Sequence, residues 1–172
     1  MNLARVISVV LVAVVLQVVF ARYAVGGRLA FDLVLVGVVF VALQGGAVAG
    51  MLAGTLGGLL TDLLSGGIVG VGGLLKTIVG CLAGVFGTQF VVAKPWARAL
   101  IVAAATPIHA LMALGLETVM DKWPGLVWTD MLGQMALNAI AGYVAFYILE
   151  RLPGAMARRG SRRRSAWGRR QW

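Results

Sequence analysis

Two charged side chains lie close together in a largely apolar part of the chain. Asp62 ends an uncharged stretch that begins at Leu33, and Lys76 follows it across the glycine-rich segment 65–73. Ionisable groups within or at the edge of a bilayer are costly, so they usually pair or line a cavity. We therefore predict an intramembrane ion pair between Asp62 and Lys76. Three roles stay open for it: locking two helices near the outer surface, recruiting a partner's membrane helix, or forming a substrate or ion site.

The other reactive side chains do not form a catalytic set. Ser65, the candidate nucleophile, lies in the glycine-rich segment without a nucleophile motif, and nothing aligns Asp32 with Asp62 as an acid pair. His109 is the single histidine and lies near Pro107, with no cysteine or carboxylate at metal-ligand spacing. No Gly-x-x-x-x-Gly-Lys loop is present to bind nucleotide phosphates. We predict a protein that is not an enzyme and that holds no metal and no cofactor.

The composition places these residues in a membrane. Of the 172 residues, 60% are hydrophobic and only 12% are charged, and the mean hydropathy is +0.94. A soluble domain of this size could not bury so much apolar surface. The single cysteine, Cys81, excludes an internal disulfide. We predict a multi-pass, all-α membrane protein.

Six apolar segments are expected to form a transmembrane bundle over residues 1–151. They lie at about 6–20, 32–43, 45–64, 71–92, 97–117 and 131–150. The second and third are short for membrane spans and are separated by a predicted turn at Gln44, Gly45 and Gly46. One long tilted helix across this turn, which gives five spans, is the competing interpretation. Pro107 is expected to kink the fifth segment because proline lacks an amide donor.

Glycines recur at helical spacing on both sides of the Asp62 region. The six predicted packing residues are Gly46, Gly50, Gly54, Gly58, Gly80 and Gly84. Residues four apart lie on one face of a helix. Small residues at that spacing let two membrane helices approach backbone to backbone. These faces are predicted to pack either within the bundle or on a partner's helix.

The C-terminal segment 152–172 is a separate, arginine-rich tail, expected to be disordered. It carries much of the formal net charge of +9. The tail arginines predicted to bind anionic lipid are Arg158, Arg159, Arg162, Arg163, Arg164, Arg169 and Arg170. A topology determinant without a ligand is the alternative, and nucleic-acid binding is not expected. Because positive residues favour the cytoplasmic side, both termini are predicted to be cytoplasmic.

The run GLLTDLLSGGIVGV at 58–71 resembles a motif of the MreD family of bacterial rod shape-determining proteins. Phe31-Asp32-Leu33 precedes it, and a glycine-bearing helix from Lys76 to Gly84 follows. The chain departs from the family pattern in three places: no proline precedes Asp32, Val69 stands where the family often has Pro or Leu, and the arginine tail is long. None of these departures alters the central motif.

The resemblance implies a small scaffold of the bacterial cytoplasmic (inner) membrane. Its implied direct partner is MreC. The RodA glycosyltransferase, a penicillin-binding transpeptidase and the MreB filament are reached through MreC. The resemblance also implies a fold similar to the six-helix substrate-binding subunits of vitamin ECF transporters.

We predict a non-enzymatic scaffold of the rod complex, which organises peptidoglycan synthesis during cell elongation. A small-molecule transporter, or the substrate-binding subunit of a vitamin-type transporter, is the alternative. A homo-oligomeric packing protein is a third option.

Overall fold

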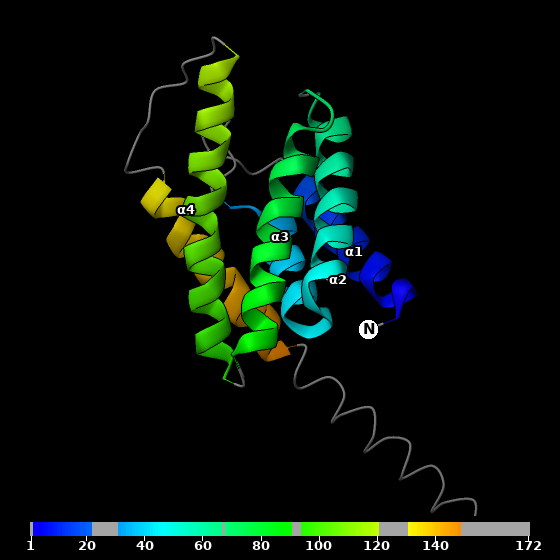
Figure 1. The fold of residues 1–172 in the computed structure, drawn as a ribbon, viewed down its shortest axis with the longest axis vertical. Helices are drawn as coiled ribbons and strands as arrows, with labels where there is room; N and C mark the ends of the chain where they lie inside the picture. The colour runs from blue at the N-terminus through cyan, green and yellow to red at the C-terminus, as the bar shows by residue number, and fades with distance from the viewer. Residues whose placement is uncertain (1, 22–30, 67, 91–93, 121–130, 149–172) are drawn as a thin grey trace, which may run out of the picture.

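The computed structural model describes residues 2–21, 31–66, 68–90, 94–120 and 131–148. The predicted tail, with the seven arginines predicted to bind lipid, lies outside these residues. The labelled helices are α1 (Leu3–Ala21), α2 (Leu33–Ser65), α3 (Val71–Gln89) and α4 (Pro95–Val119). A last helix, Met131–Ile148, follows α4. All are packed into one bundle (Figure 1).

Five helices in the described part of the chain, not six, are long and apolar enough to cross a membrane. The difference from the predicted count arises at α2, because residues 33–65 form one element of 33 residues in which Gly46, at the predicted turn, has non-helical backbone angles. Large apolar side chains cover the outside of the bundle, among them Leu11, Val48 and Leu100. The protein is therefore an all-α, multi-pass membrane protein.

The helix α2 changes direction sharply at Gly46. This residue has a φ of 80° and a ψ of −175°, far from helical values, in a region that side chains with a Cβ rarely adopt. On either side of it, a Cβ at Gly50 would meet Ala42, and a Cβ at Gly57 would meet Val34. Residues later in the second half of α2 thus face residues earlier in its first half. The helix α2 is therefore an antiparallel hairpin with a first arm at 33–45 and a second arm at 47–65.

The first arm lies at the centre of the bundle. Nine consecutive residues, 34–42, are buried, and Val38, Val39 and Val41 have no exposed surface. A helix that is apolar on every side is expected to be covered on every side. The run LVLVGVVFVAL therefore forms the core on which the other helices pack.

The second arm of α2 and α3 are packed backbone to backbone. A Cβ on Gly54 would collide with the carbonyl of Lys76, and a Cβ on Gly50 would collide with that of Gly80. Further along, Gly58 lies against Gly73. Each step of four residues forward on α2 is a step of about four back on α3, as in an antiparallel pair. This contact, which also includes a 2.8 Å hydrogen bond between the hydroxyls of Thr55 and Thr77, brings the elements around Asp62 and Lys76 into position.

Candidate functional site

Lys76 pairs with Asp32, and the predicted pair of Lys76 with Asp62 is wrong. The Lys76 Nζ lies 2.8 Å from Oδ2 of Asp32. Both residues are buried, with 4% of Lys76 and 9% of Asp32 exposed. A buried charge without a partner is strongly destabilising, so each of these two groups depends on the other.

Asp62 instead serves the start of α3. Its Oδ2 accepts hydrogen bonds from the backbone amides of Gly70, at 2.9 Å, and of Gly73, at 3.3 Å. The first amides of a helix lack helical partners and carry partial positive charge, so a carboxylate is well placed there. Asp62 is half-buried. It is near Lys76 in sequence, but the lysine extends into the bundle while the carboxylate remains with the segment that joins the helices.

The position of Asp32 follows from its role as N-cap of α2. Its Oδ1 accepts a 2.8 Å hydrogen bond from the amide of Leu35, which leaves Oδ2 for Lys76. Aspartate is among the preferred N-cap residues because its carboxylate satisfies an otherwise unpaired amide. The Asp32 amide donates to Oδ1 of Asn138 at 2.7 Å. The backbone amide and both carboxylate oxygens of Asp32 are therefore held by partners.

Polar side chains from the remaining helices extend the site. Gln17 of α1 donates to the carbonyl of Phe31 at 3.2 Å and accepts from the amide of Leu33 at 2.7 Å. Asn138 donates to the Thr106 hydroxyl of α4 at 3.0 Å. We call the five residues Gln17, Asp32, Lys76, Thr106 and Asn138 the Asp32 cluster; all five are buried. They connect all five helices.

His109 of α4 lies beside the Asp32 cluster. The imidazole is close enough to Lys76 and Asp32 to be affected by their charges. Its Nε2 is buried and has no hydrogen-bond partner among the described residues. The sequence predicts a hydrogen-bonded polar residue at a kink near Pro107, and the unpartnered Nε2 does not fulfil that prediction. Its place next to an ion pair was not foreseen.

The predicted packing glycines fall into two groups. Gly50, Gly54, Gly58 and Gly80 lie within the contact between α2 and α3, and Gly84 lies against the turn of α2 at Gly46 and Ala47. Gly46 forms that turn. All six are thus used inside the bundle.

The chemistry of the Asp32 cluster is that of a closed polar network. Its acid and base neutralise each other, and the amide and hydroxyl groups of the cluster are hydrogen-bonded to it or to nearby backbone. Across the described ranges, no group of three or more His, Cys, Asp or Glu residues is placed to hold a metal ion. The arrangement fixes helices in one register, which is the best-attested use of buried polar groups.

The chain matches the family model described as rod shape-determining protein MreD over residues 1–152. The chain belongs to the MreD family. No curated protein and no solved structure matches it. The similarity to ECF substrate-binding subunits implied by the sequence motif therefore has no support from solved structures.

Membership in the MreD family gives the two aspartates a context. Asp32 and Asp62 both belong to the segments on which the family resemblance rests, and both cap helices of the bundle. Sequence reasoning missed Gln17, Thr106 and Asn138. The available signal was that each is an isolated polar residue in an apolar membrane segment, where such residues usually face the interior and find a partner.

Proposed function

We propose that this MreD-family protein is a non-enzymatic membrane scaffold of the rod complex that binds MreC. Through MreC it would organise RodA, the penicillin-binding transpeptidase and MreB. Family membership establishes a role in rod shape determination. The observation that supports the finer proposal is the Asp32 cluster, whose ion pair and hydrogen bonds connect five helices. Such a bundle has the rigidity that a scaffold needs, and its partners would bind on its outside.

The glycine faces do not supply the surface for MreC. A Cβ on Gly54 or Gly80 would collide with the backbone of the neighbouring helix, so these positions are already occupied. Exposed side chains of the outer helices remain available, for example Val12 of α1 and Ile140 of the last helix. Partner contacts are therefore expected there, and this replaces the sequence-based expectation that a glycine face could bind MreC.

We also infer six membrane segments, with the two arms of α2 counted separately, and two cytoplasmic termini. The N-terminus, the turn of α2 and the start of α4 lie at one end of the bundle (Figure 1). Arg5 lies near the first of these, and Lys94 and Arg98 lie near the last. Clustered positive charge is typical of the cytoplasmic side.

Transport remains the alternative class, and the described residues do not favour it. The cavity between α3 and α4 is lined by apolar side chains alone. It therefore offers a polar vitamin no side-chain hydrogen bond. The polar Asp32 cluster is closed by its own internal partners.

A pull-down of the full chain from native membranes, with mass spectrometry of the co-eluting proteins, tests the scaffold proposal. MreC is expected at a level comparable to the bait, with RodA and the transpeptidase at lower levels. Substitution of outward residues one helix at a time, beginning with Val12→Trp and Ile140→Ala, should identify the helix that reduces MreC recovery. Recovery of the folded bait without any of these proteins would refute the proposal.

A further inference from the structure

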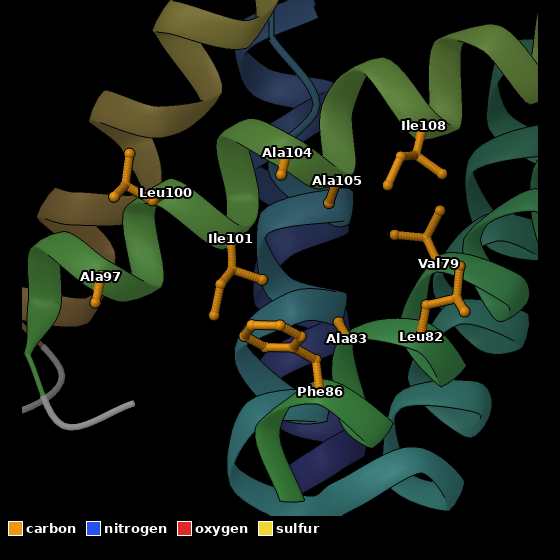
Figure 2. A pocket seen from close by; sticks show the side chains of 10 residues that line it. All are labelled: Val79, Leu82, Ala83, Phe86, Ala97, Leu100, Ile101, Ala104, Ala105 and Ile108. Atoms are coloured by element: carbon orange, nitrogen blue, oxygen red, sulfur yellow. The ribbon is translucent and has the colours of Figure 1, made fainter. Parts of the chain in front are cut away.

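A groove between α3 and α4 is not explained by the proposed scaffold. It has a volume of about 480 Å³ and is lined by ten apolar side chains. Val79, Ala83 and Ala105 form its buried floor, and larger, exposed side chains such as Leu100 and Ile108 form its rims. Figure 2 shows the side chains of the two helices facing each other across this groove. Small residues below and large residues at the sides give the surface a channel shape.

The groove is about as long as one leaflet of a bilayer. Its lining on α4 extends from Ala97 to Ile108, which is about 16 Å at a rise of 1.5 Å per residue. The hydrocarbon core of a membrane is about 30 Å thick, so one leaflet contributes about 15 Å. A partner helix that crossed the membrane would instead need a groove along the whole thickness.

The shape and chemistry of the groove suit a hydrocarbon chain. Its volume of about 480 Å³ is spread over about 16 Å of α4, so the groove is elongated. Its lining side chains offer no hydrogen bond, and a chain of methylene groups needs none.

One end of the groove lies beside a positive charge. Lys94 precedes Ala97 by one turn and is exposed, and Trp96 beside it is 56% exposed. Tryptophan at the end of a membrane helix is typical of the headgroup level. The N-terminus of α4, which has no side-chain cap, adds partial positive charge at the same place. Arg98 is already engaged, since its guanidinium lies 5.6 Å from the ring centroid of Phe146.

We infer that the groove between α3 and α4 binds one anionic phospholipid, with a hydrocarbon chain along Ala97–Ile108 and the phosphate headgroup at Lys94. The hydrocarbon chain contributes affinity because, once seated in the groove, it packs against the groove wall more closely than bulk lipid does. Lys94 contributes selectivity for anionic over zwitterionic headgroups. The lipid belongs to the leaflet on the Lys94 side. This inference does not depend on the identity of the protein's partners.

Native mass spectrometry of the full chain tests the inference. The protein is reconstituted in nanodiscs of phosphatidylcholine with a minor fraction of phosphatidylglycerol and then released into detergent. We expect one retained lipid, enriched in phosphatidylglycerol. Ala104→Phe fills the groove from its exposed wall and should abolish retention. Lys94→Gln should keep a lipid but reduce the preference for phosphatidylglycerol about five-fold, which corresponds to about 1 kcal/mol per lysine near a surface.

Two controls separate the groove from general effects. Leu52→Phe adds bulk at an exposed position of α2 away from the groove. Arg5→Gln removes a charge near the start of α1, which lies at the same end of the bundle as the start of α4. Neither should change lipid retention. The inference fails if Ala104→Phe retains lipid as the wild type does, or if Lys94→Gln and Arg5→Gln alter the preference equally. It also fails if the groove cross-links to a partner helix in lipid-free protein.

Discussion

Asp32 and Asp62 are two acidic residues at helix ends, and they differ in burial and in the groups that they bind. Asp32 begins α2, is buried, and binds the Lys76 ammonium in addition to a backbone amide. Asp62, near the end of the same helix, is half-buried, and among the described residues it binds backbone amides, those of Gly70 and Gly73. The difference shows how depth determines the partner that a carboxylate needs. At the edge of the bundle, helix amides and nearby solvent suffice, whereas in the interior a full opposite charge is required.

The largest effect is expected from disrupting the contact between α2 and α3, on which both the Asp32 and the Asp62 sites depend. Gly54→Leu should prevent folding, because any Cβ there collides with the carbonyl of Lys76 and drives α2 away from α3. Both the ion pair and the Asp62 cap would then be lost. Size-exclusion chromatography in detergent should show loss of the monodisperse species.

Gly115→Leu is the matched control for Gly54→Leu. It places the same side chain on α4, at a position with nothing within 4 Å of the added Cβ. Its elution profile should remain that of the wild type. Equal behaviour of the two variants would contradict the close contact of α2 and α3. Loss of MreC binding in Gly54→Leu would report misfolding and would not locate the partner surface.

The second prediction concerns the buried side of the comparison. Lys76→Met should lower the free energy of unfolding by about 3–5 kcal/mol, because it leaves the Asp32 carboxylate buried without its countercharge. The double variant Asp32→Asn, Lys76→Met should recover part of this loss, since no charge then remains unpaired. Denaturation of the purified protein in mixed micelles measures both values. A double variant less stable than Lys76→Met alone would show that the charges are not coupled.

A smaller effect is expected from the neutral part of the Asp32 cluster. Asn138→Leu removes the acceptor for the Asp32 amide and the donor to Thr106. We expect a loss of about 1–3 kcal/mol, the usual result of leaving a buried polar group unsatisfied. The same denaturation assay applies, with Leu137→Ala, an exposed position on the neighbouring face, as control. A change in Asn138→Leu no larger than in this control would argue against the hydrogen bonds.

The smallest effect should come from Asp62. Asp62→Ala removes the acceptor for two amides at the start of α3, and loss of a helix cap typically costs about 0.5–2 kcal/mol. Asp62→Asn should be milder because an amide oxygen still accepts a hydrogen bond. If Asp62→Ala proved as damaging as Lys76→Met, the distinction between the edge and the interior would be wrong.

The local features of the fold could be predicted from the sequence, because they depend on neighbours in the chain. The turn at Gln44–Gly46 and the four-residue glycine spacing both correspond to observed geometry. The partner of Lys76 could not be predicted in this way. The identity of that partner depends on how α3 is rotated about its axis and on the first arm of α2 lying against α3. The spacing of residues along the chain predicts neither. Two candidate aspartates were present, and proximity in sequence favoured the wrong one.

The rest of the Asp32 cluster was beyond sequence reasoning for a related reason. Asn138 is 106 positions from the Asp32 amide that it binds, and its segment carries no motif that indicates this contact. The groove between α3 and α4 arises in the same way, from small and large side chains on two helices that meet only in the folded bundle.

The short first arm of α2 has a consequence for how the protein enters the membrane during synthesis. This arm, residues 33–45, is about 20 Å long. To cross the membrane alone it would have to span about 30 Å of hydrocarbon. Its N-cap is the carboxylate of Asp32. Independent insertion of this arm is therefore unfavourable. We expect the translocation machinery to release both arms together as a hairpin, with Asp32 held near polar surroundings until the later emergence of Lys76 supplies its countercharge.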